Sequence, residues 1–279
     1  MKDYEFYLED LKSKFGKIDH KKYYLSYSGG KDSHFLYWFI KEYLKDHDIE
    51  IVSCNTFMEH NQIQKRMERY ADVIIHPSMK PLEIKEKHGS PCFSKMQDEM
   101  IDRYQRGSRS PSLMQFINGT KNNGNTMFKL NNQARELLLS DRLHRVSNKC
   151  CYYLKKEPFK KYEHISCKKA ILGVRSTESI LRKAQYTTCF NKNGKFTPLF
   201  DLTDEILDHI YEVYNIEIPP IYNMVSRTGC MGCPYGSKFG DTIAELRVLN
   251  KNQYNFVRSY FKESYQVLGI SEVQTKMDI

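Results

Sequence analysis

A run of six residues has the composition of a loop that binds phosphate: Ser28, Gly29, Gly30, Lys31, Asp32 and Ser33. The two glycines allow positive φ angles and a close approach of the backbone to an anion. The two serines offer hydroxyl groups, and the lysine offers a point charge. The aspartate would repel phosphate, so we expect it to cap a helix or to orient Mg²⁺.

The segments on either side place this loop between a strand and a helix. Tyr23–Tyr27 is a short apolar and aromatic run that is typical of a buried strand. Residues 34–46 have the apolar spacing of a helix. The first N–H groups of a helix and its dipole favour an anion at this position. A strand–turn–helix connection without a ligand is the plain structural alternative.

The loop does not have the Walker A spacing, which needs four residues between its first glycine and Gly-Lys. It resembles instead the PP-loop of the ATP pyrophosphatases and adenine nucleotide α-hydrolases. That resemblance implies an adenine nucleotide such as ATP, bound with Mg²⁺, and cleavage or exchange at its α-phosphorus. It also implies that residues 28–33 hold the pyrophosphate part of the nucleotide.

Two pairs of cysteines form a second group of residues able to do chemistry: Cys150, Cys151, Cys230 and Cys233. Four thiolates suit either Zn²⁺ or an iron–sulfur cluster. Structural zinc sites usually take their ligands from C-x₂₋₄-C pairs, and the adjacent pair does not match that spacing. Zinc, a cluster and a set of thiols without metal all remain open from the residues alone.

Three further segments resemble bacterial-type adenylyl-sulfate reductases of the PP-loop type. They are CCYYLKKEP at 150–158, the Gly-x-Arg strand end and basic helix at 173–185, and the stretch 196–234 that ends in Gly-Cys-x-x-Cys-Pro. The resemblance covers most of the chain except an insertion near 77–132. It implies a [4Fe–4S] cluster on the four cysteines, with Lys155 near it. It also gives catalytic roles to Lys31, Lys155 and Arg175.

Arg175 directly follows the apolar segment Ala170–Val174, which predicts a core strand. At the carboxyl end of a parallel strand, this arginine would face the crevice where ligands bind. Arg182 lies on the next predicted helix and shares a face with Glu178. A guanidinium group can donate two parallel hydrogen bonds to a phosphate. We therefore assign Arg175 and Arg182 to nucleotide binding, together with Gly173 at the end of the strand. A solvated, salt-bridged helix face is the alternative for this segment.

The alternation of strands and helices predicts an α/β fold with a doubly wound parallel sheet and helical additions. Further strands are expected at 49–55 and 73–76, and helices at 4–20, 62–70, 134–143 and 203–214. The stretch 77–132 is rich in Gly, Ser, Pro and Asn, with one helix expected near Ser94–Tyr104. We expect a single domain over 1–279, with this insertion and a C-terminal helical segment at 240–279.

Composition narrows the cellular setting. The 279 residues are 40% hydrophobic and carry a net charge of +9, which favours a polyanionic partner such as tRNA or DNA. No apolar run reaches the roughly 20 residues of a membrane span, and the first residues do not resemble a secretory signal. We therefore expect a cytoplasmic protein with no membrane partner, in which the cysteines serve metal binding or redox chemistry.

The resemblance also fails at one point, because no cysteine follows Cys233. Adenylyl-sulfate reductases attack sulfur with a thiolate in a C-terminal Glu-Cys-Gly motif, so their known chemistry lacks its nucleophile here. We therefore expect an ATP-dependent enzyme that transfers sulfur from a donor protein to a nucleic acid or another acceptor. The alternatives are a reductase that uses Cys92, Cys189 or a partner's thiol, and a nucleotide- and redox-sensing binding module. Cys54 is expected in the core.

Overall fold

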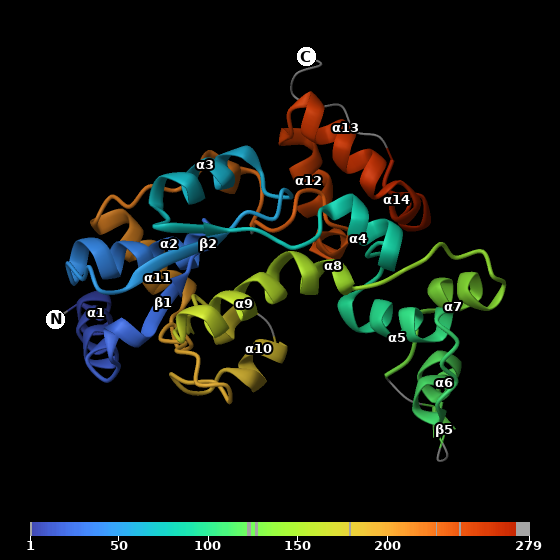
Figure 1. Ribbon diagram of the computed structural model, residues 1–279, viewed down its shortest axis with the longest axis horizontal. Coiled ribbons are helices and arrows are strands. Elements are labelled where there is room, and N and C mark those ends of the chain that lie inside the picture. Colours follow the sequence, from blue (N-terminus) through green and yellow to red (C-terminus); the bar gives the residue numbers. More distant parts are fainter. Residues whose placement is uncertain are drawn as a thin grey trace. The chain divides into compact units, whose positions relative to one another are not determined.

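The computed structural model describes residues 2–121, 124–125, 128–178, 180–226, 228–239 and 241–271 (Figure 1). Contacts group the chain into two compact units. Unit 1 consists of Met1–Asn55, Asn61–His76 and Pro158–Tyr222, and unit 2 of Thr56–His60, Pro77–Glu157 and Asn223–Ile279. Among the described residues, no helix is both long and apolar enough to cross a membrane.

Unit 1 contains a four-stranded parallel sheet in the order β3-β2-β1-β6. Its strands are β1 (Tyr23–Ser26), β2 (Glu50–Cys54), β3 (Val73–Ile75) and β6 (Lys169–Ile171). In the register of the sheet, Leu25 lies opposite both Ile51 and Ile171, and all three side chains are fully buried. The predicted α/β class with a parallel sheet is confirmed.

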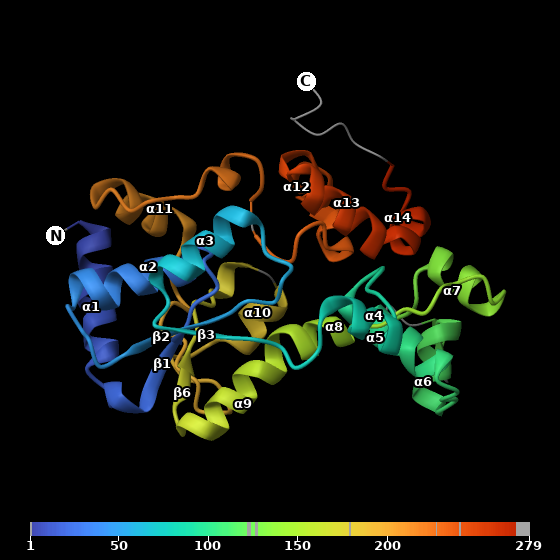
Figure 2. The same cartoon turned by 45° about the horizontal axis from the view of Figure 1, so that its top comes forward.

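Helices cover both faces of this sheet. Those of unit 1 are α1 (Asp3–Phe15), α2 (Lys31–Trp38), α3 (Asn61–Tyr70), α9 (Glu157–Ser166), α10 (Ile180–Gln185) and α11 (Asp204–Val213). Figure 2 shows α2 and α3 on one side of the strands and α9 on the other. Tyr24 faces α9, where its ring stacks on Phe159 at 6.1 Å between centroids. Successive side chains of a strand point to opposite faces, so Leu25 faces away from α9.

Unit 2 is almost entirely helical. Its helices are α4 (Pro81–His88), α5 (Lys95–Gln105), α6 (Pro111–Asn118), α7 (Asn132–Leu139), α8 (Lys149–Cys151), α12 (Asp241–Val248), α13 (Lys251–Tyr260) and α14 (Lys262–Leu268). A short hairpin pairs β4 (Thr120–Lys121) with β5 (Gly124–Asn125). One apolar cluster joins α5, α6 and α7, and a second joins α4 and the segment after α8 to the C-terminal helices.

The stretch 77–132 is more regular than the sequence suggests. One helix was expected there, but α4 and α6 are present as well as α5. Proline is the first residue of both additional helices, where its missing N–H costs no hydrogen bond. The helices are short and their apolar side chains contact distant parts of unit 2, so the local pattern is weak. The single-domain organisation stays a prediction.

Other predicted elements agree with the structure within a few residues. The first helix ends at Phe15, with Gly16 as its C-cap, and not at residue 20. The helix after the phosphate loop begins at Lys31 and continues as a π-helical turn over Phe39–Tyr43. Helix α11 begins as expected, because the Thr203 side chain accepts a hydrogen bond from the Ile206 N–H.

Candidate nucleotide site and cysteine group

The predicted phosphate loop and the predicted anion clamp lie at one edge of the sheet. The loop follows β1, and Gly173–Arg175 follow β6, the neighbour of β1. From β1 the chain builds β2 and β3 on one side, while β6 lies on the other side. Such a reversal of strand order opens a crevice at the carboxyl ends of the strands, where open α/β sheets bind ligands.

Gly29 is required by the shape of the loop. Its φ angle is +73°, in the region that favours glycine. A Cβ atom here would lie 3.0 Å from the Cγ2 atom of Ile63 and 3.2 Å from the Cγ atom of Met67, both on α3. Gly30 then serves as the N-cap of α2. The backbone of the loop is thus held between its strand and two helices.

The two serines of the loop contact each other. Their Oγ atoms are 3.1 Å apart, and the Ser28 N–H donates to the Ser33 Oγ atom at 3.2 Å. The Ser33 hydroxyl also reaches the Gly30 carbonyl at 3.0 Å. Ser33 is buried, whereas Ser28 is exposed. Ser33 therefore closes the loop, and Ser28 is the hydroxyl that an incoming anion meets.

Lys31 is held by α11 and by the turn after it. Its backbone N–H donates to the Tyr222 hydroxyl at 2.9 Å, and its carbonyl accepts from the Tyr211 hydroxyl at 2.7 Å. Its ammonium group forms an ion pair with Asp208. A phosphate bound by the loop would compete with this carboxylate for the lysine. Sequence reasoning missed these three partners, because they follow the lysine by more than 170 positions.

Arg175 joins two carboxylates at the sheet edge. Its Nε atom lies 2.6 Å from Oδ1 of Asp32, and its Nη1 atom lies 2.7 Å from Oδ1 of Asp204. Only 8% of Arg175 is exposed. The aspartate of the phosphate loop, expected to cap the helix or orient Mg²⁺, therefore contacts the predicted anion clamp. This ion pair offsets the negative charge that Asp32 brings to an anion site.

Gly173 approaches the phosphate loop closely. A Cβ atom on Gly173 would lie 3.1 Å from the carbonyl atoms of Asp32 and from the backbone nitrogen of Ser33. These are backbone atoms, so they cannot rotate away as a side chain does. Gly173 thus sets the distance between the end of β6 and the first turn of α2.

The substitution Gly173→Ala is expected to weaken ATP binding by about tenfold, since a loop shift of a few tenths of an ångström misaligns several hydrogen bonds at once. Titration of ATP into the purified protein measures this. Gly16→Ala in the same unit is the matched control, because the φ angle of Gly16 is −62° and a Cβ atom there would meet the Ser13 carbonyl oxygen at an ordinary 3.5 Å. Equal affinity in Gly173→Ala and wild type would contradict the role of this close approach.

Arg182 lies on α10, and its side chain is partly exposed. The expected shared face with Glu178 lies outside the described residues, because the side chain of Glu178 is not among them. The role of Arg182 in nucleotide binding stays a prediction.

In unit 2 the four cysteines of the two pairs come together. The hydrogen bond with Cys151 and burial raise the pKa of Cys150. The negative charges of Cys151, Cys233 and Cys230 act in the same direction. The hydrogen bond from Cys150 lowers the pKa of Cys151 to about 6, supported by nearby lysines. These residues come from segments about 80 residues apart, and their role as ligands of one metal centre stays a prediction.

The backbone around Cys230 and Cys233 is firmly fixed. Gly232 has a φ angle of +57°, and a Cβ atom there would lie 2.4 Å from Val257. The Gly232 N–H donates to a carboxylate oxygen of Glu245 at 2.9 Å. The Met231 N–H donates to the Met58 carbonyl at 2.6 Å. The glycine between the two cysteines is a sterically constrained position, and its residue type was not explained from the sequence.

Lys155 lies beside Cys230, and its catalytic role stays a prediction. The negative charge of Cys230 raises the pKa of Lys155 strongly, and Glu59 and Cys151 act in the same direction. The lysine also forms a side-chain hydrogen bond with Cys230. A cation at this place stabilises thiolates, which are the form of cysteine that binds metals.

Four thiols are suitable ligands for a zinc ion or an iron–sulfur cluster. Among the described residues, no three or more His, Cys, Asp or Glu side chains are arranged to hold a single metal ion. An iron–sulfur cluster is held by thiolates and carries negative charge. Four thiols and one paired lysine fit such an anionic cluster by their chemistry.

The remaining cysteines differ from one another. Cys54 is buried in the core, as expected. Cys92 was one of the alternative nucleophiles, but it is fully buried, and burial raises its pKa. It belongs to an apolar cluster of unit 2. Cys189 is partly buried, and burial raises its pKa as well. A raised pKa disfavours the reactive thiolate.

Asp98 organises the backbone in front of α5. Its carboxylate accepts N–H hydrogen bonds from Cys92 at 2.7 Å and from Phe93 at 3.0 Å, and the Tyr235 hydroxyl donates to it at 2.7 Å. Complete burial nevertheless raises the pKa of Asp98 to about 6, because these hydrogen bonds do not fully replace water. The folded state therefore favours the protonated acid.

This raised pKa gives a stability contribution that is present at acidic pH and is lost as the pH rises through about 6. The free energy of unfolding should therefore be about 2 kcal/mol lower at pH 7.5 than at pH 4.5 on account of this group. Urea unfolding at both values measures the difference, and Asp98→Asn should reduce it. An unchanged pH dependence in Asp98→Asn would contradict the assignment.

One known protein family matches a large part of the chain. The model of the phosphoadenosine phosphosulfate reductase domain family matches residues 106–235. The match includes all four cysteines of the group and Arg175, and it leaves out the phosphate loop. It begins inside the stretch 77–132, so the expectation that this whole stretch lies outside the resemblance was wrong. No curated protein sequence matches the chain.

Three solved structures are similar at low identity. A phosphoadenylyl-sulfate reductase from Candida auris, in a phosphate complex, has 12% identity and a TM-score of 0.44, covering 78% of this chain and 83% of its own. An NH3-dependent NAD synthetase from Campylobacter jejuni has 14% identity and a TM-score of 0.36, covering 97% and 96%. A U34-tRNA thiolase from Methanococcus maripaludis with its [4Fe-4S] cluster has 14% identity and a TM-score of 0.39, covering 99% and 82%.

These TM-scores are below 0.5, so nothing about function follows from the three likenesses. The family model covers residues 106–235, slightly less than half of the chain. This part of the chain is therefore similar to phosphoadenosine phosphosulfate reductase domains.

Proposed function

We propose that this protein is a PP-loop enzyme that activates an acceptor with ATP and then transfers sulfur to it, with a nucleic acid as the acceptor. The proposal rests on two features that lie together where the strand order of the sheet reverses. The glycine loop after β1 and Arg175 after β6 lie on neighbouring strands, at the edge where such sheets bind nucleotides.

The loop residues have the means to hold the pyrophosphate part of ATP. The helix dipole and the first N–H groups of α2 favour the phosphate charge, and Ser28 offers an exposed hydroxyl. Lys31 exchanges its Asp208 partner for a phosphate oxygen. Arg175 keeps Asp32 neutralised through their ion pair. Mg²⁺ bound to the phosphates would complete the charge balance.

The first chemical step makes the acceptor oxygen a leaving group. An oxygen of the nucleobase forms a bond to the α-phosphorus, the bond from that phosphorus to the bridging oxygen breaks, and pyrophosphate leaves with the electron pair. In the second step, hydrosulfide from a sulfur-donor protein forms the carbon–sulfur bond, and AMP leaves with the former acceptor oxygen. Sulfur enters in its reduced state, so neither step needs an oxidant or a reductant.

Cys150, Cys151, Cys230 and Cys233 would hold the [4Fe–4S] cluster, and Lys155 would balance its negative charge. With a thiolate on every iron, a bound cluster would supply local charge and structural support, and the hydrosulfide would come directly from the donor protein. The chain's own contribution is to hold the four thiols in place through the fixed backbone at Gly232, while the charge of Lys155 partly offsets the effect of burial on Cys230.

The test combines anaerobically reconstituted protein, ATP, radiolabelled sulfide and either bulk tRNA or single-stranded DNA. We expect ATP-dependent incorporation of the label into the nucleic acid. One pyrophosphate should be released from ATP for each sulfur incorporated. Label that enters without ATP, or ATP cleavage with no label in either nucleic acid, would overturn it.

The family match also favours a second candidate, a sulfonucleotide reductase. Within this chain, Cys189 is then the best remaining nucleophile, because Cys92 is fully buried. This candidate expects sulfite release from adenylyl sulfate with thioredoxin, and loss of that release in Cys189→Ser. An unchanged rate in Cys189→Ser would exclude this thiol as the nucleophile.

A further inference from the structure

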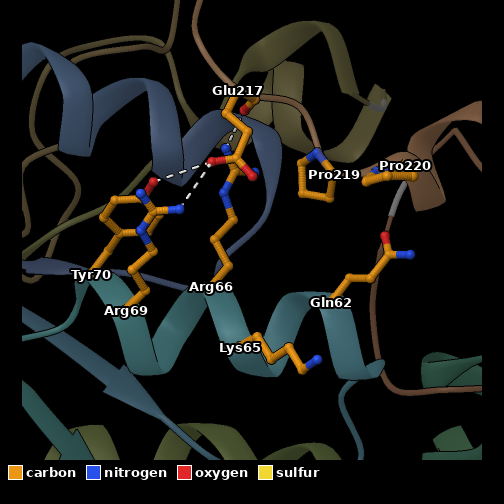
Figure 3. Close-up of a pocket in the computed structure, with 8 residues that line it drawn as sticks. All are labelled: Gln62, Lys65, Arg66, Arg69, Tyr70, Glu217, Pro219 and Pro220. Atoms are coloured by element: carbon orange, nitrogen blue, oxygen red, sulfur yellow. Dashed lines mark hydrogen bonds and ion pairs between the residues drawn. The ribbon is translucent and has the colours of Figure 1, made fainter.

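A second basic pocket lies in unit 1, between α3 and the segment that follows α11. It has a volume of about 210 Å³ (Figure 3). Three cationic side chains from α3 line it, namely Lys65, Arg66 and Arg69. Figure 3 shows Pro219 and Pro220 as the apolar side of the same pocket. The pocket thus combines a basic wall with an apolar one.

One carboxylate occupies the basic side. Glu217 lies 3.6 Å from the Arg69 guanidinium and accepts a hydrogen bond from the Tyr70 hydroxyl at 3.3 Å. Both members of the ion pair are largely exposed, with 69% of the arginine and 59% of the glutamate side chain accessible. Exposed pairs of this kind contribute little, about 0–1 kcal/mol, so a ligand can displace the glutamate.

Arg66 connects this pocket to the phosphate loop. It is 5% exposed, and among the described residues its buried Nε atom has no hydrogen-bond partner. Its Nη1 group donates to the Gly29 carbonyl at 3.4 Å, and its Nη2 group donates to the Glu217 carbonyl. A buried guanidinium group with an unsatisfied donor is costly unless a negative group lies near. It therefore favours an anionic ligand in the pocket beside it.

We propose that this pocket binds one nucleotide unit of a nucleic-acid strand, with a backbone phosphate on Lys65 and Arg69 and the sugar or base against Pro219 and Pro220. The unliganded pocket uses the Glu217 carboxylate in place of the phosphate. The net charge of +9 favours a polyanionic ligand. The choice of nucleic acid rests on the proposed function, since that function requires a nucleic-acid acceptor.

The experiment measures binding of a fluorescent single-stranded oligonucleotide to the full chain across a series of salt concentrations. The double variant Lys65→Gln, Arg69→Gln should bind at least tenfold more weakly, with a salt slope reduced by about 0.7 for each phosphate that the variant no longer neutralises. Glu217→Gln should bind about threefold more tightly, because it removes the competing charge. Lys192→Gln, on an exposed turn of the same unit, is the matched control and should bind as wild type does.

The same preparations are titrated with ATP. The pocket proposal expects ATP affinity to stay unchanged in the double variant while oligonucleotide affinity falls. Equal oligonucleotide affinity in the double variant and the control, or weaker binding by Glu217→Gln, would overturn it. Equally effective competition by inorganic phosphate or ADP would also overturn it, in favour of a free-anion site. If the wild-type protein binds the oligonucleotide but shows no ATP-dependent sulfur transfer, the result contradicts the proposed function and leaves the pocket proposal intact.

Discussion

Replacing Cys230 with serine is expected to remove bound iron and acid-labile sulfide together, and to lower the rate of sulfur transfer by on the order of 100-fold. The reason lies in the partners of this thiol. Cys230 forms a hydrogen bond with Lys155, and its negative charge is the main cause of the raised pKa of that lysine. The substitution removes one ligand and leaves the lysine with a weaker partner.

Iron and sulfide analysis after anaerobic reconstitution measures this effect, together with absorption in the visible region. Cys167→Ser is the matched control, because Cys167 is an exposed thiol outside the group. It should retain the full iron content. Equal iron content in Cys230→Ser and Cys167→Ser would contradict the assignment of the four thiols to one cluster. A loss of fold is separated from a loss of cluster by circular dichroism of both variants.

The substitution Arg175→Ala is expected to lower ATP affinity by about 100-fold and the free energy of unfolding by about 3 kcal/mol. Arg175 is buried between Asp32 and Asp204, so its removal leaves a carboxylate of the phosphate loop without its cation. The uncompensated charge then repels the phosphates of the nucleotide. ATP titration and urea unfolding of the same preparations measure the two effects.

Two further variants separate charge from geometry. Arg175→Lys keeps the positive charge but cannot hold both carboxylates with a planar fork, so it should recover stability more than ATP affinity. Arg182→Ala should change ATP affinity less than Arg175→Ala does. ATP affinity within twofold of wild type in Arg175→Ala would contradict the place of this arginine at the nucleotide site.

Local patterns were sufficient for much of the fold. The alternation of apolar strands with helices predicted the parallel sheet, and the Thr203 cap predicted the start of α11. The phosphate loop was recognisable because its glycines have a local purpose, which the positive φ angle of Gly29 confirms. The two cysteine pairs could be assigned to one metal centre from the sequence, because iron–sulfur clusters are held mainly by cysteine thiolates.

Other features depend on interactions between distant parts of the chain. Tyr211 and Tyr222 hold the backbone of Lys31, but no local pattern distinguishes them from other tyrosines. The pairing of Arg175 with Asp32 follows from the neighbouring positions of β1 and β6, which only the sheet order reveals. The short helices α4 and α6 bury their apolar residues against other parts of unit 2, so their own patterns are weak.

The loop at residues 28–33 is proposed to bind ATP for attack at the α-phosphorus. Product analysis with the reconstituted protein, ATP and nucleic acid tests this role most directly. We predict AMP and pyrophosphate in equal amounts, and loss of both in Gly29→Ala, where a Cβ atom would meet Ile63 at 3.0 Å. ADP and phosphate as products, or unchanged AMP formation in Gly29→Ala, would contradict it.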